Sequence, residues 1–228
     1  MKIIMLAVVV FFFTYSVTAQ MEKWVVKAGQ TINDALPATA KFHYAQFTNG
    51  TVHFRDETQS DALLNFNLLT GEMQFTNAKG DTLAVDNEAT IRYITISSDS
   101  FFYDKMYLQL ITANGVAKLA KKEELKIGDI KKVGAYDQPS SVSAITNITS
   151  LNSQGQMRNL TTNKEMAIIK ETSYYFGNTY NHFLPANKRN LLKLFGKKEK
   201  EIELFLKERN LNFSKEDDLK EMISFLNN

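Results

Sequence analysis

Apolar residues recur mostly at every second position between residues 42 and 111, and this spacing constrains the fold more than any other feature. An alternation of apolar and polar residues is typical of β-strands that bury one face. Polar turn segments interrupt the apolar runs roughly every ten residues, and no segment between them is long enough for a helix. The pattern therefore predicts an antiparallel β-meander in the form of a sheet, roll or open barrel, and it disfavours a parallel α/β fold.

Two glycine-containing dipeptides predict where this meander turns. Asn49-Gly50 predicts a type I′ turn between two strands, because both central residues of that turn require positive φ. Thr70-Gly71 predicts a second hairpin with a two-residue loop, in which one face is apolar and the other, which carries Asn65, faces solvent. Further strands are expected at residues 82–85, 90–96, 101–103 and 106–111.

The period of the apolar residues changes twice in the rest of the chain. Asn114-Gly115 favours one more hairpin turn, but residues 116–132 fit no single period, so a short helix is an open alternative there. Residues 138–163 draw 18 of their 26 positions from Ser, Thr, Asn, Gln, Gly and Pro. That composition favours a flexible connector over a glycan- or partner-binding loop. The final segment is helical in period and is expected to bury Leu219, Met222, Ile223 and Leu226.

These changes of pattern predict an α+β protein, with an antiparallel β domain followed by a C-terminal helical subdomain. We expect five segments: a signal peptide at 1–19, a β domain at 20–137, a Ser/Thr/Asn-rich linker or loop at 138–163, a return strand with an aromatic connector at 164–185, and a helical tail at 186–228.

The N-terminus has the pattern of a secretory signal peptide. Lys2 precedes an apolar run at residues 3–13 that is too short to span a bilayer as a helix, and residues 17–19 (VTA) suit cleavage before Gln20. An N-terminal membrane anchor is the alternative interpretation. The chain contains no cysteine, which excludes disulfides and a lipid-bearing cysteine. We therefore expect an exported protein, periplasmic or extracellular, with no lipid anchor and no membrane span after signal cleavage.

Charge and motifs argue against several classes of function. The chain has 27 basic and 25 acidic residues, a net charge of +2, and this balance together with export argues against a nucleic-acid partner. The sequence contains no nucleophile, phosphate-binding or dinucleotide motif, so no catalytic residue is assigned and no cofactor is expected. The Asn49-Gly50 turn would place His43 and His53 on opposite faces of the sheet, so no metal site is expected.

Aromatic residues are densest between residues 173 and 185. Aromatic faces bury a large area at low entropic cost, and for that reason they suit carbohydrate and peptide sites. The ligand-binding candidates in this segment are Tyr174, Tyr175, Tyr180 and His182. Gly177 and Pro185 punctuate the segment like a folded connector, which favours the alternative that the rings seal the junction between the sheet and the helical tail.

Four stretches of the sequence resemble one protein family. They are LNFNLLTGEMQF at 64–75, KGDTLA at 79–84, the stretch at 134–141 that begins with GAY, and residues 174–185 with the helical tail that follows. Together they resemble an uncharacterised family of exported Gram-negative bacterial proteins without an assigned function. The resemblance implies an exported, β-rich fold with a helical C-terminal tail, and it implies no catalytic residue.

Two classes of function follow from these observations. The first is an exported, non-enzymatic binding or scaffold module of the bacterial envelope, whose partner is an envelope protein or a glycan. The alternative is a hydrolase that acts on polysaccharide or cell-wall material through paired carboxylates. A binding module predicts exposed aromatic side chains, whereas a hydrolase predicts a cleft with two carboxylates and at least one raised pKa.

Overall fold

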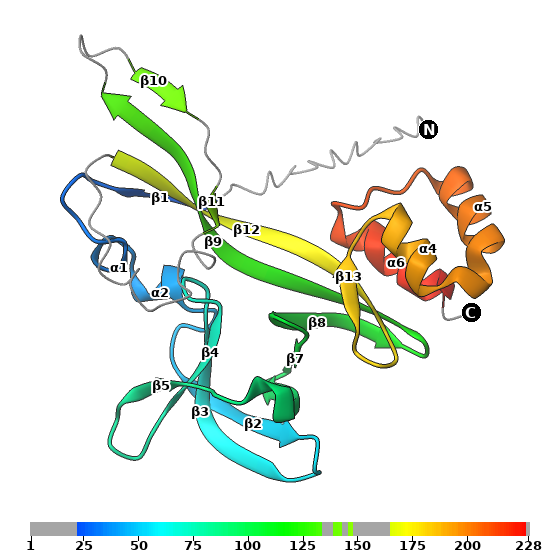
Figure 1. Cartoon of the computed structure of the whole chain (residues 1–228), viewed down its shortest axis with the longest axis horizontal. Coiled ribbons are helices and arrows are strands. Elements are labelled where there is room, and N and C mark those ends of the chain that lie inside the picture. The colour runs from blue at the N-terminus through cyan, green and yellow to red at the C-terminus, as the bar shows by residue number, and fades with distance from the viewer. Residues whose placement is uncertain (1–21, 134–138, 143–145, 148–164, 227–228) are drawn as a thin grey trace, which may run out of the picture.

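The computed structural model describes residues 22–133, 139–142, 146–147 and 165–226 (Figure 1). The strands are β1 (Lys23–Val26), β2 (Thr48–Phe54), β3 (Gln59–Asn67), β4 (Glu72–Thr76), β5 (Thr82–Ala84), β6 (Ile91–Ile96), β7 (Asp99–Tyr103), β8 (Tyr107–Asn114), β9 (Ala117–Val133), β10 (Pro139–Val142), β11 (Thr146–Asn147), β12 (Glu165–Asn178) and β13 (Phe183–Pro185). The helices are α1 (Ile32–Ala35), α2 (Ala38–Lys41), η1 (Glu88–Thr90), α4 (Lys188–Leu194), η3 (Gly196–Lys198), α5 (Glu199–Arg209) and α6 (Glu216–Leu226). The predicted signal peptide and most of the predicted linker lie outside the described residues.

The described strands form one antiparallel sheet in the order β1-β12-β9-β8-β7-β6-β2-β3-β4-β5. β10 and β11 add to β9, and β13 adds to β12. Strands β6 to β9 follow one another in chain order, and so do β2 to β5, because short turns join antiparallel neighbours. The predicted antiparallel meander with a helical C-terminal tail is confirmed, and Figure 1 shows α4, α5 and α6 gathered at one end of the long β9 and β12 strands.

The sequence pattern of residues 116–132 does not distinguish a helix from a strand. In the structure these residues belong almost entirely to the 17-residue strand β9. The expected hairpin turn exists but is shifted by one residue: Asn114 belongs to β8 and pairs with Ala117, so the loop is Gly115-Val116, with Gly115 at φ 59°. The helix alternative is wrong because β9 is paired along its length with β8 or β12, which satisfies its backbone hydrogen bonds without a helix.

The prediction of a turn at Asn49-Gly50 is wrong, because both residues lie inside β2. Gly50 pairs with Ala62 of β3 on one side and with Ile96 of β6 on the other. A Cβ atom at Gly50 would lie 2.5 Å from the carbonyl oxygen of Thr95. Glycine is therefore required here by the close approach of a neighbouring strand, which is the other common reason for glycine in a strand.

The Thr70-Gly71 hairpin exists, but its loop is four residues long, because Asn67 pairs with Glu72. The side-chain oxygen of Asn67 accepts hydrogen bonds from the backbone N–H groups of Leu69 and Thr70, which stabilises the longer loop. The expectation that Asn65 faces solvent is also wrong, because its side chain is 1% exposed.

Asn65 is buried because the segment after α2 covers the polar face of β3. Its amide group donates to the backbone carbonyl oxygen of Tyr44 and accepts from the backbone N–H of Tyr44. The last four residues of β3, 64–67, are thus buried on both faces of the strand. Alternation in the sequence cannot distinguish a polar face in water from a polar face that bonds another segment.

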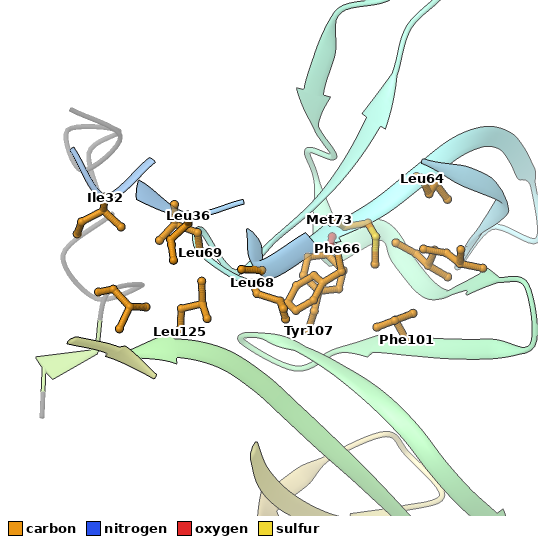
Figure 2. Packing of buried hydrophobic residues seen from close by; sticks show 14 of the residues in the cluster. Ile32, Leu36, Leu64, Phe66, Leu68, Leu69, Met73, Phe101, Tyr107 and Leu125 are labelled. Carbon is orange, nitrogen blue, oxygen red and sulfur yellow. The ribbon is translucent and has the colours of Figure 1, made fainter. Parts of the chain in front are cut away.

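Two apolar cores lie on the same face of β9, since its odd-numbered residues share one face. Near one end, Leu125 packs with Ile32 and Leu36 of the N-terminal helices and with the β3–β4 hairpin (Figure 2). Near the other end, Leu119 packs against the C-terminal helices. The face predicted for the last helix is confirmed: Leu219, Met222, Ile223 and Leu226 are all buried. None of the described helices combines the length and the apolar character needed to cross a membrane.

We expect Gly50→Ala to destabilise the fold by about 1–3 kcal/mol, because the added methyl group overlaps the Thr95 carbonyl and the Leu64 side chain. The measurement is urea unfolding at neutral pH. Gly196→Ala is the matched control, since Gly196 lacks neighbours within 4 Å and is expected to stay within about 0.5 kcal/mol of the parent. Equal stability of the two variants would contradict the close approach of β6 to β2.

Candidate ligand-binding face

The face of the sheet opposite to the two large cores is here called the open face. It carries a smaller apolar cluster. Its members come from strands β6 to β9, β12 and β13 and from the β7–β8 turn, and none comes from a helix. They are Tyr93, Phe102, Met106, Leu108, Leu110, Ala120, Tyr175 and Phe183. Among the described residues, therefore, this cluster is built without helical side chains.

Aromatic rings follow one another from strand to strand across this face, from β2 through β6 and β7 to β13. His53 stacks on Tyr93 with 4.2 Å between ring centroids and 20° between ring planes. Tyr93 and Phe102 follow at 6.1 Å, and Phe102 and Phe183 at 5.9 Å. The rings at the β2 side remain part-exposed, whereas Phe102 and Phe183 are almost fully buried beneath their neighbours.

Phe183 reaches this face because its partner in the strand ladder is a glycine. Gly177 of β12 pairs directly with Phe183 of β13, and a Cβ atom at Gly177 would lie 2.4 Å from Cε1 of the Phe183 ring. The backbone N–H of Phe183 also donates to Oδ2 of Asp104 at 2.8 Å. The β12–β13 hairpin is therefore anchored across the sheet to the β7–β8 turn.

Two cationic side chains lie over neighbouring rings of the row. Nζ of Lys118 is 4.9 Å from the Phe102 ring centroid, and Cζ of Arg92 is 6.0 Å from the Tyr93 ring centroid. Lys118 donates a hydrogen bond to the Asn181 side-chain oxygen. Within the described part of the chain, neither cation forms an ion pair with a carboxylate. Burial is the main cause that lowers the pKa of Lys118, and the positive charge of Arg92 lowers it further.

The structure distributes the four sequence-predicted ligand residues over three places. Tyr175 belongs to the open face, and Nδ1 of His182 lies 3.3 Å from Oδ2 of Asp104. Tyr174 is on the opposite face, where its hydroxyl donates to Glu216 of α6. Tyr180 is 89% exposed in the turn before β13. They do not form one platform, because successive residues of a strand point to opposite faces.

The alternative interpretation, that these rings seal the junction between sheet and helices, holds for part of the segment. Phe176 is fully buried in the core beneath the C-terminal helices, together with part-buried Tyr174. The residues that sequence reasoning missed on the open face are Arg92 and Lys118. The residue types alone do not indicate a binding site, because isolated basic residues in strands are usually solvated. Only the fold brings these two side chains together.

No family model, no curated protein and no solved structure matches this chain. The family resemblance found in the sequence therefore stays a prediction.

The most buried of the described carboxylates, Glu124, pairs with Lys122 and Lys126. Its neighbour Glu123 belongs to an ionic network on the helix-covered face. Nδ1 of His43 lies 3.0 Å from Glu123, and Nε2 of His43 lies 3.9 Å from Asp99. Burial alone would raise the pKa of Glu123, but the hydrogen bond with His43 and the charges of Lys121 and Lys170 lower it to about 2. A general acid requires the opposite shift. Within the described ranges, no three His, Cys, Asp or Glu side chains are arranged to hold a metal ion.

The His43–Glu123 contact predicts a loss of stability in acid. The pKa of Glu123 is about 2 in the folded protein and 4.5 without its surroundings, so its stabilising contribution is complete above pH 4.5 and is lost as the pH falls towards 2. Between pH 5 and pH 3 the parent should lose about 1–2 kcal/mol more unfolding free energy than Glu123→Gln, measured by urea titration. Glu203→Gln, an exposed change in α5, should keep the parental pH dependence. Equal pH profiles for the parent and Glu123→Gln would contradict the network.

Proposed function

We propose that this protein is an exported, non-enzymatic binding module of the bacterial envelope that holds an acidic polysaccharide on its open face. The observation that carries the proposal is the pair of cations, Arg92 and Lys118, over two adjacent rings and without carboxylate partners among the described residues. The pattern of the N-terminus supports export, and the absence of catalytic motifs supports a binding role.

An anionic ligand fits these two cations for an electrostatic reason. Lys118 is part-buried. Burial and the charge of Arg92 both disfavour the charged form of its amine and therefore lower its pKa. A carboxylate between the two side chains would offset both effects and would accept charge-assisted hydrogen bonds from each. The ligand class that the open face favours is therefore anionic.

A carbohydrate fits the rest of the open face better than a peptide does. A pyranose ring has an apolar C–H face that can lie against Tyr93 and Tyr175, while its hydroxyl groups remain free to bond the polar side chains at the edge. His182 and Asn181 provide such polar groups beside Lys118. A chain of uronic acids combines both features, because each unit carries a carboxylate and an apolar ring face.

The hydrolase alternative is disfavoured by the state of the buried carboxylates. Glu123 is held as an anion by His43, Lys121 and Lys170, so it is poorly suited to donate a proton to a leaving group. His43 and these lysines occupy the positions around the carboxylate at which a substrate would have to bind. The network is better explained as a structural contact between the segment after α2 and strands β7, β9 and β12.

The test is a binding measurement with polygalacturonate, an acidic polysaccharide, and with dextran as the neutral control. Calorimetry on the parent protein should detect polygalacturonate but not dextran, and added salt should weaken the binding. The double variant Arg92→Gln, Lys118→Gln should lower the affinity at least about tenfold, because two charge-assisted contacts are removed.

The matched control is Lys200→Gln, Lys207→Gln, which removes the same charge from exposed positions of α5. This variant should bind polygalacturonate like the parent. Equal weakening in both double variants would show attraction by net charge alone and would overturn the site. Stronger binding of poly-glutamate than of polygalacturonate would identify the partner as an acidic protein instead.

A further inference from the structure

A shallow groove, here called the side groove, lies on strands β2, β3 and β6 and has a volume of about 620 Å³. Gly50 shows which residues of β2 face the core, because a Cβ atom there would contact the core side chains of Leu64 and Ile96. Neighbouring residues in a strand point to opposite faces, so the odd-numbered residues of β2 point to the open face. Apart from Gly50 and Ala62, the residues that line the side groove are Asn49, Thr51, Asp61, Leu63, Thr95 and Ser97.

Side-chain contacts place the polar groups of the side groove on one face and connect them to the row of rings. Oγ1 of Thr51 donates a hydrogen bond to Oδ1 of Asp61 at 2.6 Å, between directly paired residues of β2 and β3. Oγ1 of Thr95 lies 3.3 Å from Nε2 of His53, whose ring stacks on Tyr93. The side groove therefore continues the open face from Tyr93 and His53 towards β3.

The polar residues of the side groove are accessible to a ligand. Asp61, Asn49 and Ser97 are exposed, and Thr51 and Thr95 are part-exposed. Within the described part of the chain, the Asp61 carboxylate forms no ion pair and accepts its hydrogen bond from Thr51 through one oxygen, Oδ1. Its second oxygen can therefore accept hydrogen bonds from a bound molecule.

This set of groups suits a neutral sugar unit. Sugar hydroxyl groups can donate to the Asp61 carboxylate and to the hydroxyl oxygens of Thr51 and Thr95. The Leu63 side chain, which is 44% exposed, offers an apolar surface to the C–H groups of a sugar ring. An acidic sugar unit is unfavourable in the side groove, because its carboxylate would be repelled by that of Asp61.

The side groove is close enough to the cations of the open face for one oligosaccharide to reach both. Arg92 lies over Tyr93 on β6, and Asp61 belongs to β3, with β2 between the two strands. Neighbouring strands are about 4.8 Å apart, so β6 and β3 are separated by roughly 10 Å. This separation is comparable to the length of a disaccharide. A sugar unit at the cations would therefore place a nearby unit of the same chain at Asp61.

We infer that the side groove binds a neutral sugar unit of the same polysaccharide whose acidic unit binds Arg92 and Lys118. The ligand is then an acidic heteropolysaccharide, in which uronic acid units alternate with neutral sugars. Asp61 is the residue that selects against an all-acidic chain. This inference rests on the proposed function, because it requires an acidic polysaccharide on the open face.

The test compares hexasaccharides of equal length by calorimetry at about 0.15 M salt. Hexagalacturonate is the all-acidic probe, and the hexasaccharides of hyaluronan and unsulfated chondroitin are the alternating probes. We expect the parent to bind at least one alternating probe more tightly than hexagalacturonate, although the alternating probes carry half the charge. Asp61→Asn keeps an acceptor for Thr51 and removes the charge, so it should lower the ratio of these two affinities at least about fivefold.

Glu201→Gln is the matched control, because it removes one negative charge from an exposed position of α5. This variant should keep the parental ratio. Both affinities are measured on the same protein, so a loss of folded molecules would affect both equally. An unchanged ratio in Asp61→Asn would overturn the inference. Tighter binding of hexagalacturonate than of both alternating probes by the parent would overturn it as well.

The same probes distinguish failure of this inference from failure of the proposed function. Weaker binding of all three probes by Arg92→Gln, Lys118→Gln, together with an unchanged ratio in Asp61→Asn, would retain the cation site and reject the neutral subsite. Undiminished binding by Arg92→Gln, Lys118→Gln, or absence of binding to every probe by the parent, would reject the proposed function and the side-groove inference with it.

Discussion

The pairing of β9 with β12 holds the molecule together. The two strands are joined from the pair Glu165–Lys131 to the pair Asn178–Ala117, with one irregularity between Met166 and Ile168. The meander attaches to one edge of this ladder through β8, and β1 attaches to the other edge. The helices pack at its two ends on one face. Because this ladder joins segments far apart in the chain, its formation carries a large loop-closure cost that both cores must offset.

The space between the two cores on the shared face contains charge instead of apolar side chains. Glu123 lies there, in contact with His43, Lys121 and Lys170. A buried carboxylate is tolerated only when its partners are in place, so this network fixes the segment after α2 relative to β9. The same segment bonds Asn65 through the backbone of Tyr44. Specific polar contacts, and not only apolar packing, therefore position the N-terminal part of the chain.

The open face is covered unevenly, because β13 pairs with only a short part of β12. Met106 lies in the turn between β7 and β8 and packs into the apolar cluster of this face. Among the described residues, Arg92 and Lys118 form no ion pair with a carboxylate, although Lys118 donates a hydrogen bond to Asn181. The proposed binding role rests on this positive charge.

The sequence by itself determined the class of the fold: alternation predicted the antiparallel strands, and the helical spacing of Leu219 and Ile223 predicted the last helix, because local periodicity records which face is buried. Only the tertiary structure decided the register of the strands and which segments cover each face of the sheet. Gly50 follows from the approach of β6 and not from a turn, and Asn65 is buried by a segment distant in the chain. The candidate sites were likewise beyond the sequence, apart from Tyr175 and His182. Arg92 and Lys118 come close to each other only when non-local strands pair, and no local pattern encodes that proximity.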